Sequence, residues 1–270
     1  MQTKINKQAV QASFSKAATC YDQFADLQRE IGHRLIEMTP AVDNTVSVHV
    51  LDLGCGTGYF SKILSQHVSS EDNKPLEITC FDLSPEMLNQ AEERNIPHSH
   101  FVAGDIDNLP FTDELFDTIY SNLVVQWSDN LSNCLQQVKQ AIKVKGSFCF
   151  STLLNGSLNE LQQAWKLVDN NQHVNEFLDE SVVRLALKQA DFKNYTLVTE
   201  TRVKQFPNVI SVMRALKGIG ANHVHNGSKP MLTGRQLLQK IEQGYQPFKD
   251  ALGLYNLTYE VCYVVAINDN

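Results

Sequence analysis

The chain has 270 residues, of which 43% are hydrophobic and 20% are charged. This is an ordinary globular composition, and the length suffices for one large hydrophobic core. The formal net charge of -7 argues against a surface built to bind nucleic acid, because such a surface is basic. We also find no apolar run of membrane-spanning length and no secretory signal pattern at the N-terminus.

The six cysteines are scattered among apolar neighbours, without Cys-x-x-Cys pairs or the dense spacing of a disulfide framework. We therefore expect reduced thiols and a cytoplasmic protein. Two histidine pairs stand at alternate positions, His98 with His100 and His223 with His225. No set of cysteines or carboxylates accompanies them, so no metal site is expected.

Apolar residues recur at helical spacing from Phe14 to Met38, which predicts one or two amphipathic helices before the first strand. Strand and helix patterns then alternate. Strands are expected at 46–53, 78–83, 100–103, 116–122 and 148–153. Helices are expected at 58–68, directly after Ser84-Pro85 and at 131–142, with Lys145-Gly146 as a turn. Strands separated by helices imply parallel β-α-β units, and so a doubly wound α/β sheet.

After residue 153 the pattern changes to helices at 158–168, 181–189 and 208–218 and strands at 195–206 and 255–267. Residues 221–233 are rich in Asn, Gly, His and Pro and are expected to form a loop or lid. Without a repeat or a linker, we expect a single domain. Its parts are an N-terminal helical lid (1–40), a cofactor-binding core (46–153) and a substrate- or carrier-facing segment (154–270).

A glycine-rich turn, Gly-Cys-Gly-Thr-Gly at 54–58, ends the first strand and opens a helix. Open α/β sheets bind ligands at the carboxyl ends of their strands, where this turn lies. Glycines can adopt positive φ and let backbone amides come close to the ligand. A dinucleotide fingerprint would place its third glycine where Tyr59 stands. The spacing of Gly54, Gly56 and Gly58 instead resembles the first motif of class I methyltransferases, which use S-adenosylmethionine.

Polar residues at the ends of the next strands predict the rest of this cofactor site. Asp82, with Leu83 beside it, ends the second strand, where a carboxylate accepts hydrogen bonds from both ribose hydroxyls. Asp105 and Ile106 follow the third strand. Asp105 is placed to accept a hydrogen bond from the adenine amino group, and the Ile106 amide to donate one to the adenine ring. Asn122 ends the fourth strand and would face the methionine part. The alternatives are a strand-end cap for Asp82, an Asx turn for Asp105 and a loop-starting hydrogen bond for Asn122.

Longer segments carry a closer resemblance. They are residues 14–18, 21–22, 82–85, 87–88, 121–123, 125–127, 156–161, 164–165, 173–175, 177–178 and 216–221. Through them the chain resembles the malonyl-acyl carrier protein O-methyltransferases of biotin synthesis. The resemblance implies a Rossmann-like class I methyltransferase fold, a mostly parallel seven-stranded sheet with helices on both faces and an N-terminal helical lid. It also implies methyl transfer from S-adenosylmethionine to the free carboxylate of malonyl-acyl carrier protein or malonyl-coenzyme A.

The same resemblance assigns roles to residues outside the cofactor motifs. Tyr21 would close over the sulfonium and the acceptor, and Phe177 would wall the acceptor pocket. Lys217 would pair with the substrate carboxylate or its carrier, and His173 would hydrogen-bond the malonyl group. The alternatives are core packing for Tyr21 and Phe177 and an ordinary surface position for Lys217. For His173 the alternative is a hydrogen bond to a local backbone group. A malonyl carboxylate is already ionised near neutral pH, so we expect positioning and exclusion of water rather than general base catalysis.

Between residues 184 and 217, seven basic residues stand against two acidic ones. Six of them are predicted to dock the carrier: Arg184, Lys188, Lys193, Arg202, Lys204 and Arg214. Local positive charge in an acidic chain suits an acidic partner, which the resemblance identifies as acyl carrier protein. A solvated face without a partner is the alternative. Rival functions are methylation of a quinone or small free acid, cofactor-dependent regulation without chemistry, and NAD-linked oxidation.

Overall fold

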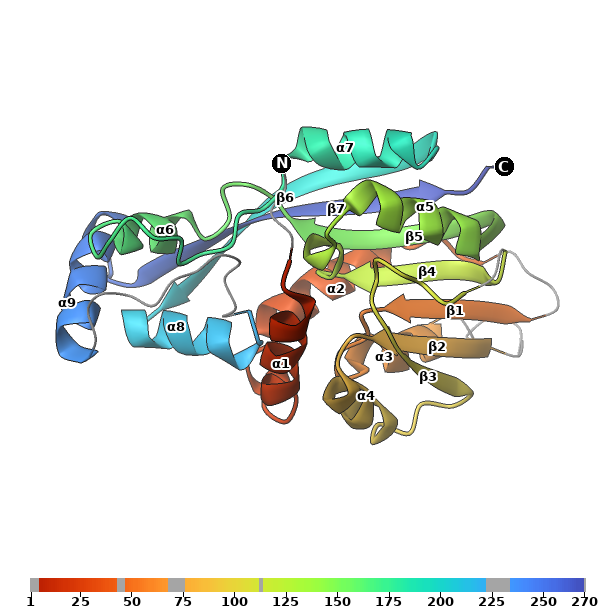
Figure 1. The fold of residues 1–270 in the computed structure, drawn as a ribbon, viewed down its shortest axis with the longest axis horizontal. Helices are drawn as coiled ribbons and strands as arrows, with labels where there is room; N and C mark the ends of the chain where they lie inside the picture. Colours follow the sequence, from red (N-terminus) through yellow and green to blue (C-terminus); the bar gives the residue numbers. More distant parts are fainter. Residues whose placement is uncertain (1–4, 43–46, 68–75, 112–113, 222–233, 270) are drawn as a thin grey trace.

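A computed structural model describes residues 5–42, 47–67, 76–111, 114–221 and 234–269. Its centre is a seven-stranded sheet with the order β3-β2-β1-β4-β5-β7-β6 (Figure 1). The pairs among β1 to β5 are parallel, and β7 lies antiparallel between β5 and β6. The strands are β1 (Val48–Leu53), β2 (Leu76–Asp82), β3 (Ser99–Ala103), β4 (Phe116–Asn122), β5 (Ile142–Leu153), β6 (Asn194–Phe206) and β7 (Tyr255–Ile267). The predicted doubly wound, mostly parallel sheet is confirmed.

Helices cover both faces of this sheet, as predicted. The α-helices are α1 (Lys7–Ala17), α2 (Asp26–Met38), α3 (Tyr59–His67), α4 (Pro85–Glu92), α5 (Leu131–Ala141), α6 (Asn159–Trp165), α7 (Glu180–Gln189), α8 (Val209–Gly218) and α9 (Gly234–Tyr245). Short 3-10 turns are η1 (Tyr21–Gln23), η2 (Val125–Trp127) and η3 (Gln246–Phe248). Buried residues of α2, α3, α4, α6, α8 and α9 share one hydrophobic core, and those of α5 and α7 share a second. The two cores lie on opposite faces of the sheet.

Side-chain caps fix where the helices leave the carboxyl edge of the sheet. The Ser84 hydroxyl accepts a hydrogen bond from the Met87 amide at 3.2 Å, and Pro85 fills the first turn of α4. A proline there loses no intrahelical bond, since first-turn amides have no helical partner. The Asn130 side chain caps α5 in the same way, through the Asn133 amide.

The predicted turn at Lys145-Gly146 is wrong. Both residues lie inside β5, which begins at Ile142, directly after α5. Lys145 has a φ of +67°, and the pairing of β4 with β5 shifts register next to it. The residues do bend the chain, but as an irregularity within one strand.

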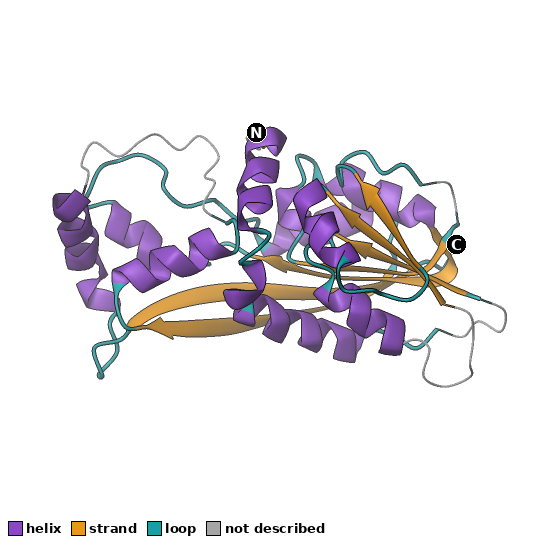
Figure 2. Cartoon of the chain, turned by 90° about the horizontal axis from the view of Figure 1, so that it is seen from below, coloured by secondary structure: helices purple, strands orange, loops and turns teal. Residues whose placement is uncertain are grey.

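Strands β6 and β7 extend beyond the parallel strands (Figure 2). Each has 13 residues, whereas β1 to β4 have 5 to 7. Helix α9 packs on both α6 and α8, and α6 and α8 also pack on this extension. Helix α1 stands between that layer and the carboxyl ends of β1 and β4 (Figure 1). The second half of the chain therefore builds a wall opposite the glycine-rich turn.

Helix α9 was not predicted, and it directly follows the segment assigned to a loop. Residues 222–233, which make up most of that loop, lie outside the described residues, as do His223 and His225. Within the described ranges, no helix is long and apolar enough to cross a membrane.

Candidate active site

The glycine-rich turn has the backbone that its sequence predicts. Gly54, Gly56 and Gly58 have φ values of +79°, +53° and +75°, which other residues adopt only with strain. The Gly54 amide donates to the Phe81 carbonyl at 2.7 Å. The Gly56 amide donates to Asp82 Oδ2 at 2.9 Å. The turn is therefore fastened to the end of β2, which brings the two predicted cofactor motifs together.

The three glycines have different surroundings. A Cβ at Gly54 would lie 2.2 Å from Val124, and one at Gly58 would lie 2.7 Å from Ala91. A Cβ at Gly56 would meet nothing within 4 Å. Gly56 also borders two cavities, whereas Gly58 lines neither of them. The open space that a predicted cofactor needs therefore lies over Gly56, and Gly58 serves the packing of α3 against α4.

One of these cavities, which we call the edge cavity, runs along the ends of β2, β3 and β4. It is lined by Asp82, Leu83, Asp105, Ile106 and Asn122, together with residues of the turn and of α1. All five predicted cofactor residues beyond the glycines are therefore brought together. The lining combines two carboxylates with apolar side chains, which suits a nucleoside.

Helix α1 covers the edge cavity through polar contacts. Lys7 Nζ lies 2.6 Å from Asp105 Oδ1 and 2.7 Å from Asp107 Oδ2. The Gln11 amide donates to the Leu83 carbonyl at 2.8 Å. Asp105 Oδ1 also accepts the Asp107 amide at 3.0 Å, so the Asx turn is present beside the predicted adenine contact. These contacts place the N-terminal helix where a lid is expected.

The second cavity, the turn cavity, lies on the other side of Gly56. It is lined by residues of η1, α2, β1, the turn, α3 and Asn122. Asn122 Nδ2 donates to the Gln28 carbonyl at 2.9 Å, and its Oδ1 accepts from Ser151 at 2.8 Å. Its side chain thus pins α2 to the sheet while it borders both cavities, so the loop-type hydrogen bonding and the predicted site position coexist.

Two residues that line the turn cavity were not predicted from the sequence. Gln28 and Arg29 line it from α2, seven and eight positions after Tyr21. Gln28 Oε1 is buried without a hydrogen-bond partner among the described residues. Arg29 lies with its guanidinium 5.5 Å from the Tyr59 ring. A buried acceptor without a donor and a cation at a cavity wall fit an amino acid group such as the methionine end of the predicted cofactor.

One buried carboxylate, Asp52, and one half-buried carboxylate, Asp82, line the turn cavity and the edge cavity. Burial raises the pKa of Asp52 to about 7, against the hydrogen bond from Ser61 Oγ at 2.6 Å. Burial raises the pKa of Asp82 to about 6, against the amide hydrogen bonds from Ser84 and Gly56. Both carboxylates are more easily protonated here than in water, because burial removes the water that hydrates the charged form.

The raised pKa of Asp52 predicts a stability cost for the free protein. The folded pKa of about 7 exceeds the ordinary value of 3.8, so the stability that its proton provides is complete below about pH 4 and is lost as the pH rises through 7. Asp52→Asn should therefore raise Tm at about pH 8 by about 3 °C or more and change it little near pH 4. Thermal unfolding at both pH values tests this, with the exposed Asp191→Asn as control. A loss of stability at pH 8 would contradict it.

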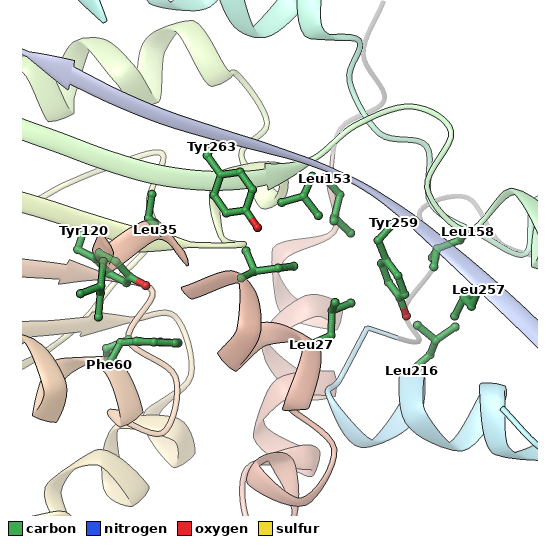
Figure 3. Close-up of a cluster of buried hydrophobic side chains, with 14 of the residues drawn as sticks. Leu27, Leu35, Phe60, Tyr120, Leu153, Leu158, Leu216, Leu257, Tyr259 and Tyr263 are labelled. Atoms are coloured by element: carbon green, nitrogen blue, oxygen red, sulfur yellow. The ribbon is translucent and has the colours of Figure 1, made fainter. Parts of the chain in front are cut away.

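The third cavity, the apolar cavity, lies between α1, α2, α6, α8 and β7. Figure 3 shows part of its wall, with Leu216 of α8 facing Tyr259 of β7. Phe177 and His173, to which the resemblance assigns acceptor roles, also line it. Such a cavity excludes water from a bound group.

Tyr21 is the residue that the described parts of all three cavities share. It begins η1, between α1 and α2. Burial, with Asp82 and Asp22 nearby, raises the pKa of its phenol well above the ordinary value. The phenol is therefore neutral at physiological pH and can donate a hydrogen bond at the junction of the cavities.

His173 has a local partner as well as a place in the wall. Its Nε2 lies 2.7 Å from Asp169 Oδ1, and its ring stacks on Trp165 with the centroids 3.9 Å apart. The local contact considered for this histidine is therefore present, to a side chain rather than to the backbone. Lys217, in contrast, is exposed on α8 and does not line the cavity.

The six residues predicted to dock the carrier do not form one continuous surface, and their docking role stays a prediction. Arg184 and Lys188 lie on α7, whose buried side belongs to one core, and Arg214 lies with Lys217 on α8, whose buried side belongs to the other. Acidic neighbours also pair with several members. These pairs are Arg184–Glu180, Lys193–Asp191, Arg202–Glu200 and Lys204–Glu30. These basic residues are close in sequence but do not share one face of the protein, because α7 and α8 flank opposite sides of the sheet.

Comparisons with known proteins decide the family. A model of a methyltransferase domain matches residues 44–205. The malonyl-[acyl-carrier protein] O-methyltransferase of Pectobacterium atrosepticum is 40% identical over 264 residues, which cover 98% of each chain. The chain belongs to the malonyl-[acyl-carrier protein] O-methyltransferase family. The protein of that name from Serratia marcescens is also 40% identical, over 96% of each chain.

Other similarities fit this O-methyltransferase family. The biotin biosynthesis bifunctional protein BioHC of Cellvibrio japonicus is 35% identical over 97% of this chain, which spans 50% of that longer protein. A solved putative methyltransferase from Bacillus halodurans has a TM-score of 0.61 at 16% identity, covering 88% of this chain and 98% of that one. The predicted enzyme class and the Rossmann-like methyltransferase fold are thereby confirmed.

Proposed function

We propose that the enzyme transfers a methyl group from S-adenosylmethionine to the free carboxylate of malonyl-acyl carrier protein, an early step of biotin synthesis. The observation that carries this proposal is the position of Tyr21, which lines the edge cavity, the turn cavity and the apolar cavity. The relatives named for this activity match nearly the whole chain. We also propose a cytoplasmic location, consistent with six free cysteines.

The residues present fit S-adenosylmethionine. Asp82 would accept the ribose hydroxyls, Asp105 and the Ile106 amide would meet the adenine, and the open space over Gly56 would admit the backbone of the cofactor. Gln28 and Arg29 would hold the methionine ammonium and carboxylate, which supplies the missing donor to Gln28 Oε1. When bound, the cofactor supplies a methyl group on a positively charged sulfur, ready for nucleophilic attack.

The acceptor needs no general base, because a malonyl carboxylate is ionised near neutral pH. The neutral Tyr21 phenol would donate a hydrogen bond to one carboxylate oxygen and leave the other free to attack. Phe177 and Leu216 wall the cavity with apolar surface, which removes water from the carboxylate and makes it more reactive. Catalysis would then rest on orientation and exclusion of water.

Methyl transfer from labelled S-adenosylmethionine tests the function. The acceptors compared are malonyl-acyl carrier protein, malonyl-coenzyme A, succinyl-acyl carrier protein and free malonate. We expect the highest kcat/KM for the malonyl carrier and low labelling of the succinyl carrier. Labelling of free acids alone, or of a quinone, would instead identify a small-molecule methyltransferase.

The carrier is expected to dock beside α8. Met213, Leu216 and Ile219 line the apolar cavity, and the exposed Arg214 and Lys217 each follow a lining residue by one position. A carrier protein is acidic, so this basic edge would guide the malonyl arm to the cavity mouth. Lys217 would then contact the carrier rather than the substrate carboxylate.

Charge reversal distinguishes this edge from the rest of the predicted basic set. The double variant Arg214→Glu with Lys217→Glu should raise KM for malonyl-acyl carrier protein about tenfold and flatten its salt dependence. The matched control, Arg184→Glu with Lys188→Glu on α7, should leave both near wild type. Activity on malonyl-pantetheine, which has no carrier surface, should be unchanged in both. Equal effects of the two double variants would contradict docking at α8.

A further inference from the structure

Asp22, the residue after Tyr21, has an unusual number of charged and polar partners. Thr57 Oγ1, in the glycine-rich turn, donates to Asp22 Oδ1 at 2.8 Å. Arg94, just beyond the end of α4, donates to Asp22 Oδ2 and to the Thr57 carbonyl. One carboxylate therefore ties η1 both to the cofactor turn and to α4.

The backbone of Asp22 is held as well. Its carbonyl oxygen accepts a hydrogen bond from Arg29 Nη1 at 2.8 Å. The guanidinium groups of Arg29 and Arg94 lie 5.5 Å and 5.7 Å from the centroid of the Tyr59 ring, a distance at which cations are attracted to aromatic rings. The contacts form a connected unit around one residue rather than a single surface ion pair.

This unit sits at the joint between a fixed helix and a covering helix. Helix α2 is attached to the sheet, because Tyr120 donates to the Gly32 carbonyl at 2.9 Å and Asn122 donates to the Gln28 carbonyl. Helix α1 contacts the edge cavity through Lys7 and Gln11, which bond to Asp105, Asp107 and Leu83, and through Val10 and Phe14 in the lining. η1 connects the two, so whatever holds Asp22 also holds Tyr21.

We propose that Asp22, Thr57 and Arg94 form a latch that holds Tyr21 over the cofactor site, and that opening this latch limits product release. That product is S-adenosylhomocysteine, which remains when S-adenosylmethionine has lost its methyl group. The inference rests on the proposed function, in which Tyr21 closes over the methyl donor. Arg94 lies outside the lining of the three cavities, so it acts through Asp22 as a positioning residue. Its side chain is 23% exposed and that of Asp22 is 45% exposed, so dissolved salt should weaken the latch.

The test measures how fast S-adenosylhomocysteine leaves the full-length protein, by stopped-flow fluorescence. Arg94→Met should speed dissociation about tenfold, as expected for loss of a charge-assisted hydrogen bond, and Arg94→Lys should restore part of the difference. Added salt should speed release from the wild type and have little effect on Arg94→Met. Arg34→Met, which removes an arginine of α2 paired with Glu37 and Glu200, should release the ligand at the wild-type rate.

A double-mutant cycle with Tyr21→Ala separates the latch from general loosening. If Arg94 acts through Tyr21, Arg94→Met should add little to the faster release of Tyr21→Ala. Wild-type release from Arg94→Met, or full additivity in the cycle, would overturn the latch. Normal S-adenosylhomocysteine binding without methylation of malonyl-acyl carrier protein would instead overturn the proposed function and leave this test intact.

Discussion

Asp82→Ala is expected to weaken S-adenosylmethionine binding by about 100-fold or more. The substitution removes a carboxylate that would accept two ribose hydroxyls, and hydrogen bonds to charged groups contribute about 1.5–3 kcal/mol each. It also removes the acceptor of the Gly56 amide, which shapes the turn. Isothermal titration with the cofactor measures the loss, and circular dichroism checks that the variant is folded.

Asp82→Asn provides the matched comparison. It keeps the shape and one acceptor oxygen, so we expect an intermediate loss of affinity. The pKa of about 6 for Asp82 in the free protein adds a pH dependence, since the protonated acid no longer accepts from two hydroxyls. Wild-type affinity should fall as the pH drops below about 6, and the asparagine variant should lack that step. Undiminished affinity in both variants would remove Asp82 from the cofactor site.

Tyr21→Ala should lower kcat for malonyl-acyl carrier protein by about 100-fold, because it removes both a cavity wall and a hydrogen-bond donor at the reacting carboxylate. Tyr21→Phe keeps the ring and loses only the hydroxyl, so about a tenfold loss is expected. Steady-state kinetics with both substrates varied would separate kcat from KM. Tyr195→Phe, on β6 and away from the cavities that contain Tyr21, serves as control.

The comparison of Tyr21→Phe with Tyr21→Ala also tests the role of the phenol. If both variants keep wild-type kcat, Tyr21 packs in the core and does not act on the acceptor, which is the alternative considered from the sequence. If Tyr21→Phe alone is normal, the ring closes the cavity without donating a hydrogen bond to the carboxylate.

The cofactor half of the fold could be predicted because its signals are local. Gly54 and Gly56 predict a turn with positive φ. Asp82, Asp105 and Asn122 each end or follow a strand. Parallel strands bring such ends to one edge of a sheet, so strand position alone predicts that these residues meet. The structure brings all of them to the cavities around the turn.

The acceptor half depends on contacts between distant segments, which periodicity does not report. Tyr259 of β7, Leu27 of α2 and Leu216 of α8 meet only because β6 and β7 extend past the other strands. The basic residues of 184–217 lie apart for another reason, which is that α7 and α8 flank opposite sides of the sheet. Lys145 was assigned to a turn because a bulge and a turn use similar residues.

Gln28 and Arg29 were missed for a different reason. Polar residues on an amphipathic helix are ordinarily solvated, and nothing in their own sequence marks these two as facing a cavity. Their separation of seven and eight residues from Tyr21 was the available signal. It becomes meaningful once η1 and α2 are seen to line the same cavity.

The central claim is that the carboxylate of malonyl-acyl carrier protein receives the methyl group. Its most direct test is the intact mass of malonyl-acyl carrier protein before and after incubation with the enzyme and S-adenosylmethionine, with fragmentation to locate the added mass on the malonyl group. The account predicts a malonyl carrier heavier by one methyl group on that acyl group, and an unchanged succinyl carrier. An unmodified malonyl carrier, with cofactor binding demonstrated in the same sample, would contradict it.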